Sequence, residues 1–422
     1  MAAMTTPSNC IGESGFARGR NVSQSGFTLV ELMVAIALGL IVTLVITGAV
    51  LSMGRQFRIT GANAAAQGSA QVALGVMDAV GRSAGAGLYS NSQPVCSLLN
   101  AWRGGSVRSN GAVFMPVRIT DGGGAGDSDV VVFTAASGAG ALSAMPVVEN
   151  MATADAVIRV GNIGSIQNDD LALIGVPSDP TVPCTLFQAN TVTPPPGSLP
   201  CGPNVAACKS LARTTSASTG YNPTPATVFA TTPVYGYDSA TPGVSGPAVV
   251  TRLGAAFRQD AFRVLCNSLV QYNAFTDAPA CTAVPLGFSG GAQPLAMDVV
   301  LMQAQYGISV GGASDIVTNW VNAVNVGGTD WSNPSVGNAA RVKAVRVIIV
   351  TRSKEPQNAT ATAASCTNTG GVVNTGPCSF DDAEAPAIDL SAIPVPAGRT
   401  WQNYGYRVHQ AVVPLRNVIW SN

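Results

Sequence analysis

The feature that most constrains this chain is an unbroken apolar stretch that begins at Gly26 and extends to about Met53. A helix needs about 20 apolar residues to cross the hydrocarbon core of a bilayer, and this stretch is longer. Its only charged residue is Glu31. A carboxylate costs roughly 2.5–3.5 kcal/mol at the bilayer centre, so an intramembrane Glu is expected to be functional. The sequence therefore predicts one transmembrane helix over residues 27–53.

The segment before the helix, residues 1–26, is polar, rich in Gly and Ser, and contains two arginines. A secretory signal peptide places its apolar core before the cleavage site. Here the order is reversed, because the small residue Gly26 precedes the apolar core. Cleavage after Gly26 would leave the helix on the mature protein. The positive-inside count does not decide the orientation, since two arginines also follow the helix.

The helix is expected to continue beyond the membrane over residues 54–86, because no proline occurs between Phe27 and Gln93. Glycines recur in it every seven residues, at Gly54, Gly61, Gly68 and Gly75. That spacing keeps them near one stripe of the helix, where small residues allow close packing. The stripe would face either the globular sheet or adjacent subunits. The alternative is a Gly/Ala-rich stretch with an accidental period.

The remainder, residues 87–422, is predicted to be a β-rich head domain. Strand-like runs occur at residues 112–119, 129–134, 156–160, 171–175, 248–257, 261–270, 294–307, 341–353 and 404–417. A short helix is expected within residues 315–325. Residues 177–247 are rich in Pro, Thr, Ser and Gly, which predicts a loop insertion outside the core. The fold class is α+β, with a long N-terminal helix packed on an antiparallel sheet domain with disulfide-rich loops.

The cysteines indicate an oxidising compartment. Cys10 precedes Gly26, and eight follow the helix: Cys96, Cys184, Cys201, Cys208, Cys266, Cys281, Cys366 and Cys378. An even count is typical of paired cysteines in an exported domain. Sequence neighbours suggest Cys201–Cys208, Cys266–Cys281 and Cys366–Cys378, which leaves Cys96–Cys184. Many other pairings are open, and reduced core cysteines are the alternative.

Composition argues against several classes of function. The formal net charge is zero, only 10% of residues are charged, and Lys and Arg do not cluster. A nucleic-acid partner would need a basic surface, so none is predicted. His409 is the only histidine, and no nucleophile elbow or P-loop is present. The sequence therefore predicts no catalytic residue, no cofactor and no metal site.

Two acidic clusters have plain interpretations. Asp121, Asp127 and Asp129 share a Gly-rich loop, which suggests calcium, but their spacing fits no common calcium loop. A turn between two strands is the preferred interpretation. The second cluster contains Asp381, Asp382 and Glu384 beside Cys378, and it is interpreted as a solvated loop.

Residues 26–32, Gly-Phe-Thr-Leu-Val-Glu-Leu, resemble the processing site of type IV prepilins and pseudopilins. The resemblance implies that prepilin peptidase cuts between Gly26 and Phe27 on the cytoplasmic side, and that Phe27 is then methylated. It also implies that Glu31 pairs with the free amino terminus of a neighbouring subunit. The alternative for Glu31 is a carboxylate held near a helix start by the macrodipole. A leader of 26 residues is long for many such prepilins, but a start at Met4 does not move the cut.

Later blocks extend the resemblance to the PilW-like minor pilins. They are residues 85–89 with Cys96, then 128–132, 299–307, 344–353 and 406–417. None is specific alone, and their order along the chain carries the resemblance. It implies an inner-membrane protein with a cytoplasmic amino terminus and a periplasmic head that later reaches the pilus surface. The implied partners are other minor pilins, the major pilin and a tip adhesin.

Three functions remain open from the sequence. The first is a minor pilin that takes part in assembly and initiation of a type IV pilus at its tip. The second is a minor pseudopilin of a type II secretion system, which shares the N-terminal motif. The third is a membrane-tethered periplasmic binding protein, which a pocket with converging carboxylates or a bound ion would favour.

Overall fold

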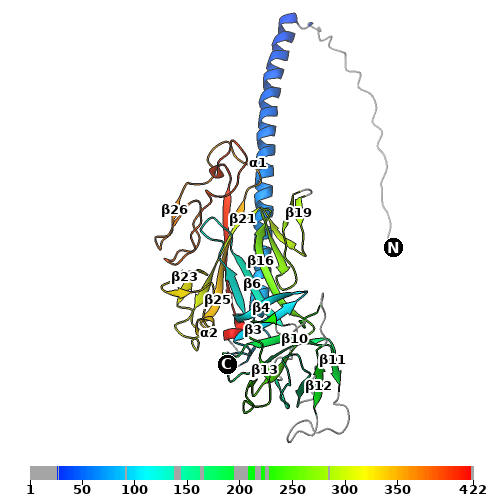
Figure 1. Ribbon diagram of the computed structural model, residues 1–422. Helices are drawn as coiled ribbons and strands as arrows, with labels where there is room; N and C mark the ends of the chain where they lie inside the picture. The colour runs from blue at the N-terminus through cyan, green and yellow to red at the C-terminus, as the bar shows by residue number, and fades with distance from the viewer. Residues whose placement is uncertain are drawn as a thin grey trace, which may run out of the picture. The chain divides into compact units, whose positions relative to one another are not determined.

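The computed structural model describes residues 26, 28–90, 93–136, 144–161, 166–193, 208–213, 220–223, 228–283 and 286–419. The chain divides into two compact units, residues 1–58 and residues 59–422. Helix α1, Leu29–Ser83, contributes residues to both units. All other elements belong to the second unit (Figure 1). The predicted fold class, a long N-terminal helix with a large antiparallel sheet domain and disulfides, is confirmed.

Two sheets flank the part of α1 that lies in the second unit. The four-stranded sheet has the order β22 (Asn319–Val321), β21 (Val299–Ile308), β25 (Val342–Arg352) and β28 (Tyr406–Pro414). The five-stranded sheet has the order β20 (Gln293–Met297), β17 (Ser268–Asn273), β16 (Phe257–Leu265), β6 (Val130–Ala136) and β5 (Val117–Thr120). All pairings within these two sheets are antiparallel.

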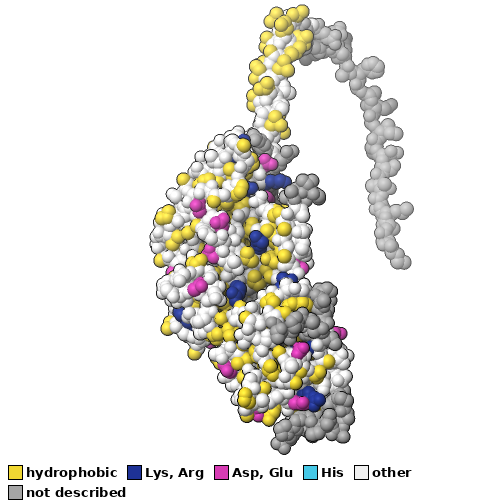
Figure 2. Space-filling view, in the orientation of Figure 1, with side chains coloured by type: hydrophobic (Ala, Val, Ile, Leu, Met, Phe, Trp, Pro, Cys, Tyr) yellow, Lys and Arg dark blue, Asp and Glu magenta, His cyan; other side chains and the backbone are white. Residues whose placement is uncertain are grey.

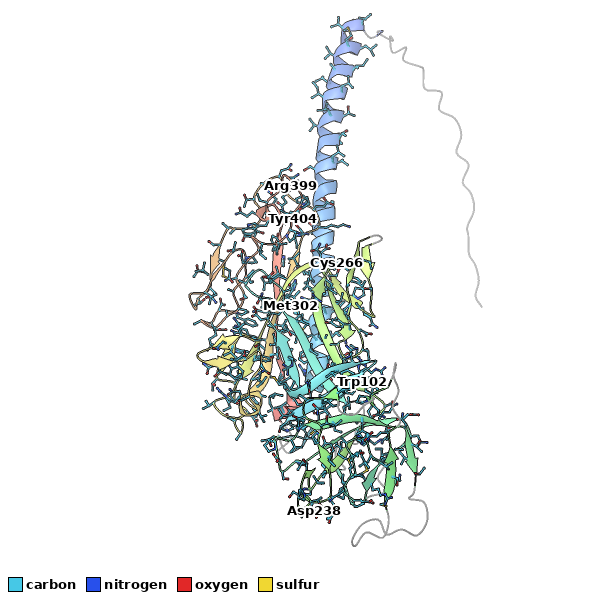
Figure 3. The ribbon with its side chains drawn as sticks, viewed as in Figure 1. Trp102, Asp238, Cys266, Met302, Arg399 and Tyr404 are labelled. Atoms are coloured by element: carbon cyan, nitrogen blue, oxygen red, sulfur yellow. A yellow bond between two sulfur atoms is a disulfide. The ribbon has the colours of Figure 1, made fainter. Side chains whose placement is uncertain are left out.

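A third sheet forms the lower part of the head in Figure 1. Its order is β4 (Ser106–Val113), β3 (Leu98–Arg103), β10 (Cys184–Ala189), β9 (Asp170–Gly175), β15 (Val249–Gly254) and β7 (Ala144–Pro146). A small sheet beside it contains β11 (Thr191–Thr193), β12 (Lys209–Ala212) and β8 (Ile158–Val160). Trp102 of β3, labelled in Figure 3, lies near the boundary with the upper sheets.

The remaining elements are two-stranded pairs and short helices. The two-stranded pairs are β1 (Tyr89–Ser90) with β2 (Gln93–Pro94), β13 (Val234–Tyr235) with β14 (Val244–Ser245), β18 (Cys281–Ala283) with β19 (Leu286–Phe288), β23 (Asn325–Val326) with β24 (Thr329–Asp330), and β26 (Cys366–Thr367) with β27 (Val373–Asn374). The short helices are α2 (Val336–Ala339), η3 (Trp401–Asn403) and α3 (Arg416–Ile419).

The second-unit part of α1 packs through one stripe of small and apolar side chains. The buried members are Ala70, Ala73, Leu74, Met77 and Gly81. Their spacing of mainly three and four residues keeps them on one helical face. Most of this stripe shares a single hydrophobic core with both the five-stranded and the four-stranded sheets. The helix therefore forms the inner layer against which the two sheets close.

Gly81 marks a close approach between α1 and the sheets. A Cβ at this position would collide with Cγ1 of Val413 on β28 and lie 3.1 Å from Phe133 of β6. Phe133 is itself held edge-on against Phe262, with ring centroids 5.9 Å apart. Glycine allows this approach because it has no side chain.

The end of α1 is capped from distant parts of the chain. The last carbonyl groups of a helix have no partner within the helix. Asn417 Nδ2 donates to the carbonyl oxygens of Arg82 (3.2 Å) and Ala84 (3.1 Å). Gly85, with φ of +78°, turns the chain, and its N–H donates to the Thr134 carbonyl at 2.8 Å. The C-terminal residues and strand β6 thus hold the helix end.

The four-stranded sheet is buried on both faces. On β25, Val345 and Val347 face the core around α1, whereas Ile348 and Val350 face a second cluster that contains Leu390. Successive residues of a strand point to opposite faces, so both sets must be apolar. This explains the continuous apolar run of β25. The segment between β26 and β28 covers the second face.

Residues 177–247 contain a core strand, so the prediction of a loop insertion outside the core is wrong for this part. Strand β10 lies between β3 and β9 in the six-stranded sheet. Phe187 of β10 shares a hydrophobic core with Leu211 and Tyr235. The Pro- and Thr-rich flanks of β10 do not predict a strand of six residues between them. It forms because burial between neighbouring strands outweighs the local composition. Residues 194–207, 214–219 and 224–227 lie outside the described residues.

The helix predicted within residues 315–325 is also wrong, since this segment contains strand β22. Trp320 of β22 lies over Gly307 of β21, where a Cβ would be 2.7 Å from ring atom Cζ3. The tryptophan thus fills a space that Gly307 leaves open. Pairing with the edge of β21 determines the conformation here.

Two disulfides join described residues of the second unit. Cys266 is bonded to Cys281, with Cα atoms 5.8 Å apart, and Cys366 is bonded to Cys378, with Cα atoms 5.4 Å apart. Both join sequence neighbours that the sequence analysis paired. Figure 3 labels Cys266. The first bond links the turn between β16 and β17 to β18, and the second links β26 to the segment that covers the four-stranded sheet.

The suggested Cys201–Cys208 pair falls partly outside the described residues. Cys208 is disulfide-bonded and buried against Val148. Cys201 is not described, so this pairing stays a prediction.

The suggested Cys96–Cys184 bond is wrong, because both residues are buried free thiols. Each sulfur is directed to a backbone carbonyl: Cys96 Sγ donates to Leu98 at 2.8 Å, and Cys184 Sγ donates to Val95 at 3.8 Å. Burial, together with the adjoining Cys184, raises the pKa of the Cys96 thiol well above its usual value. The pair is therefore accommodated as neutral core thiols.

Replacing Gly81 with Ala is expected to destabilise the protein by about 1–3 kcal/mol, because the added methyl group overpacks the contact with Val413 and Phe133. Gly75→Ala is the matched control. Gly75 is exposed with no atom near an added Cβ, so its replacement should stabilise the helix by up to about 1 kcal/mol. Denaturant unfolding of the full chain in detergent measures both. Equal effects of the two substitutions would contradict the packing described for Gly81.

Candidate functional site

The first unit contains a helix segment able to cross a membrane. Residues Leu29–Gly54 have a mean hydropathy of 2.8 over 26 residues, and none of the segment is buried within the chain. At about 1.5 Å per residue it is roughly 39 Å long, which exceeds the roughly 30 Å of a hydrocarbon core. Figure 2 shows hydrophobic side chains, in yellow, around its described residues. Thr47 satisfies its hydroxyl inside the helix by donating to the Thr43 carbonyl at 2.7 Å.

Thr28 and Glu31 form a capping box at the start of this helix. The backbone N–H and the Oγ1 hydroxyl of Thr28 donate to Glu31 Oε2, at 3.0 and 2.9 Å. The Glu31 N–H donates back to Thr28 Oγ1 at 3.3 Å. This reciprocal pattern satisfies N–H groups that lack partners at a helix start. The sequence analysis missed the role of Thr28, although Thr followed three residues later by Glu is a known signal for it.

The cap leaves one oxygen of Glu31 available. Both hydrogen bonds from Thr28 end on Oε2, and within the described residues no donor reaches Oε1. The Glu31 side chain is exposed. An external cation can therefore bind Oε1 without opening the cap. The two interpretations of Glu31, as a cap and as an ion-pair partner, are compatible.

Gly26 precedes the capping box and has no close neighbour among the described residues. It is exposed, and a Cβ built on it meets no atom within 4 Å. The fold therefore does not require glycine at this position. Phe27 and residues 1–25 lie outside the described residues, so the cleavage and methylation positions stay predictions.

The glycine stripe of α1 does not face the sheets. No atom lies within 4 Å of a Cβ built on Gly54, Gly61, Gly68 or Gly75. Within the second unit the stripe lies away from the buried face, since Gly75 is exposed whereas Leu74 is buried. The sheet is thus excluded as the partner of Gly61, Gly68 and Gly75.

The Gly-rich acidic loop joins β5 to β6 and is tied to the four-stranded sheet by Asp129. The buried Asp129 carboxylate accepts from the N–H of Gly122 at 3.0 Å and from the N–H of Ala304 on β21 at 2.7 Å. Its own N–H donates to the Met302 carbonyl at 2.9 Å. Burial raises the pKa of Asp129 to about 7, although the two N–H donors act to lower it. This carboxylate is engaged in joining the two sheets.

The second acidic cluster anchors the segment that covers the four-stranded sheet, so the interpretation as a solvated loop is incomplete. Arg346 of β25 is buried and donates to both oxygens of Asp382, at 2.6 and 3.1 Å, and to Gln305 Oε1 at 2.6 Å. These hydrogen bonds from Arg346 lower the pKa of Asp382. Glu384 accepts from the N–H of Trp320 at 2.7 Å. Arg346 also lies 4.8 Å from the Trp320 ring centroid.

His409 lies on β28 without an acid–base partner in the described residues. Its Nε2 is 3.2 Å from Thr351 Oγ1 on the neighbouring strand. Partial burial lowers the pKa of His409, and the nearby Arg407 acts in the same direction. The contact is a cross-strand pair within the four-stranded sheet.

These features define a class of protein: a subunit with one membrane-length helix that begins in a capping box and continues into a β-rich head. Two family models match parts of the chain. Residues 21–47 match the prokaryotic N-terminal methylation motif, and residues 281–417 match the family of Type IV Pilus-assembly protein W. The predicted resemblance to PilW-like minor pilins of the type IV pilus is confirmed by these two matches. No curated protein and no solved structure matches the chain.

The PilW match covers the whole four-stranded sheet. Residues 281–417 include all four strands of the β22-β21-β25-β28 sheet and the segment that covers its second face. The two earlier PilW-like blocks, residues 85–96 and 128–132, lie outside the match. The matches support a type IV pilus-related pilin and indicate a structural pilus component. The apolar helix and the methylation motif fit anchoring in the inner membrane.

Asp129 is expected to make stability depend on pH. Its folded-state pKa of about 7 lies above the ordinary value of 3.8, so its stabilising contribution is present at low pH and is lost as pH rises through about 7. The wild type should therefore lose stability relative to Asp129→Asn between pH 5 and pH 8, by at most about 1.4 kcal/mol per pH unit. Thermal unfolding of both proteins in detergent measures this difference.

Asp127→Asn is the control for that measurement, because Asp127 is in the same loop with an exposed side chain. Its pH profile should follow that of the wild type. A difference between the wild type and Asp129→Asn that stays constant from pH 5 to pH 8 would rule out the titration of Asp129.

Proposed function

We propose that this chain is a minor pilin that is processed by prepilin peptidase and takes part in the assembly of a type IV pilus. Cleavage between Gly26 and Phe27 removes the leader, and Phe27 is then methylated. The mature protein stays in the inner membrane through α1, with its amino terminus cytoplasmic and its head periplasmic. Its partners are other pilins, which it joins in starting a filament.

The observation that carries this proposal is the start of α1. The capping box begins the helix at Leu29, immediately after the predicted processed terminus at Phe27. Glu31 is held there with Oε1 open to an external cation. The free amino group of a neighbouring processed subunit supplies such a cation. In lipid this ion pair is weakly screened, so it can set the axial register of the helix in a bundle.

The glycine stripe supports packing of α1 against other helices. Each helical glycine costs about 1 kcal/mol relative to alanine, and nothing in the chain compensates at Gly54, Gly61, Gly68 or Gly75. Close approach of helices from adjacent subunits offers such compensation. A filament core made of α1 helices would provide this contact.

The size of the head favours a position at the filament tip. The second unit comprises residues 59–422, a large volume to repeat along a closely packed shaft. A tip position requires one copy. A tip adhesin is then a further candidate partner.

A minor pseudopilin of a type II secretion system is the second candidate, because the N-terminal motif is shared between the two systems. The match of residues 281–417 to the PilW family favours the pilus. Mass spectrometry of sheared surface filaments tests the choice. Recovery of this chain with a major pilin supports the pilus, whereas its absence from filaments together with loss of protein secretion in a deletion strain supports the secretion system.

Replacing Gly26 with Leu is expected to block processing and leave residues 1–26 on the chain. Because Gly26 touches nothing, the substitution should leave the fold intact. Intact mass of the membrane-extracted chain measures the result. Gly39→Leu is the control, since Gly39 also has no neighbour within 4 Å but lies inside the helix, and it should be processed normally. A wild-type chain with any amino terminus other than Phe27 would refute the cleavage position.

Replacing Glu31 with Gln is expected to lower recovery in sheared filaments roughly tenfold or more, because the ion pair is lost while a Gln at this position can still form a capping box. Thr28→Ala is the matched variant, since it removes the cap and keeps the charge. It should reduce recovery much less. Both variants should insert in the membrane as the wild type does. Equal recovery of Glu31→Gln and wild type would refute the pairing role.

A further inference from the structure

A cavity of about 330 Å³ lies within the head, away from helix α1. Its floor is the face of the five-stranded sheet that carries Arg118, Val132 and Thr134, together with Gln259 of β16. The opposite face of this sheet carries Phe133 and packs against α1. Small-molecule sites have volumes of about 300–1,000 Å³, so the cavity is large enough for one small ligand.

The wall of the cavity comes from β4 and the turn after it. It contains Arg108, Ser109, Val113 and Phe114. The residues that line the cavity include two arginines and no Asp or Glu. In a chain where only 10% of residues are charged, two guanidinium groups in one cavity are a marked local excess of positive charge.

Neither arginine is neutralised within the described residues. The ion pairs found there involve other cations, and Arg108 and Arg118 belong to none of them. Arg118 donates through Nη2 to the Val113 carbonyl at 2.9 Å, which fixes the guanidinium and leaves its other N–H groups for a ligand. Arg108 is exposed. Arg118 is half-buried, and a guanidinium pairs favourably with a planar carboxylate through two parallel N–H donors.

Aromatic packing supports one side of the cavity. Phe275, which lines the cavity, is stacked on Tyr221 with ring centroids 5.8 Å apart and meets Phe257 edge-on at 5.1 Å. The Arg103 guanidinium lies 4.4 Å from the Tyr221 ring centroid on the same stack. A ligand would thus enter a preformed site, which reduces the ordering cost of binding.

The lining combines three kinds of group. Two guanidiniums suit a carboxylate, the Thr134 hydroxyl and the Gln259 amide suit ligand hydroxyl groups, and the Val113 and Phe114 side chains suit an apolar ring face. We propose that this cavity binds an acidic monosaccharide unit, with its carboxylate between Arg108 and Arg118. Figure 2 shows Lys and Arg side chains among hydrophobic ones in the middle of the head. The proposal does not depend on assembly into a pilus.

The test is isothermal titration of the purified full chain in detergent with D-glucuronate, D-glucose and inorganic phosphate. Glucuronate and glucose differ in the carboxylate, so glucuronate should bind at least tenfold more tightly. Phosphate should bind at least tenfold more weakly than glucuronate, because it lacks the hydroxyl groups and the ring. Binding of glucuronate and glucose with equal affinity, or of phosphate as tightly as glucuronate, would overturn the proposal.

Variants connect the binding to the cavity. Arg108→Gln and Arg118→Gln should each weaken glucuronate binding roughly tenfold or more. Arg108 is exposed and makes no hydrogen bond within the described residues, so its replacement should not affect folding. Arg263→Gln is the matched control, because Arg263 is an exposed arginine of β16 that does not line the cavity. Equal effects of Arg108→Gln and Arg263→Gln, or no glucuronate binding by the wild type, would refute the site.

Discussion

The contact of α1 with two sheets around Gly81 is the interaction on which the head depends. The buried stripe of the helix supplies the inner layer of the core, and the five-stranded and four-stranded sheets close over it. Strand β28 and residue Asn417, at the far end of the chain, complete this contact. The core of the head thus joins the first helix to the last strand of the chain. Contacts between segments so far apart in the sequence are expected to make folding slow.

Charged residues are few, and several in the head have a specific structural task. Arg346 and Asp382 fasten the covering segment to the four-stranded sheet, and Asp129 joins the acidic loop to β21. The buried member of each interaction, Arg346 or Asp129, exchanges water for hydrogen bonds within the protein, which is the condition under which a polar or charged group can leave solvent. Arg108 and Arg118 differ from these residues, because neither forms an ion pair with a carboxylate of the described residues.

The start of α1 illustrates how one residue can serve both the fold and an assembly. Thr28 engages Oε2 of Glu31, so the helix is capped before any partner arrives. The membrane segment gains no burial from its own chain, and its apolar side chains are satisfied only by lipid or by other helices. A capped start and an open carboxylate oxygen lie in the first turn of α1, and the glycines from Gly61 to Gly75 lie on a face of the helix that the sheets do not cover.

The sequence by itself determined the membrane helix, its continuation to about residue 84, the antiparallel class of the head and the PilW-like resemblance. These follow from local signals: apolar length, absence of proline, β-branched runs and a short motif at Gly26. Tertiary structure decided what local signals do not encode. Strand β10 and Trp320 take their conformation from neighbouring strands, and Cys96 and Cys184 are buried free thiols whose sulfurs each contact a backbone carbonyl. Packing between distant segments likewise determines which way the glycine stripe faces. It also determines how Asp382 is anchored and where the two-arginine cavity forms.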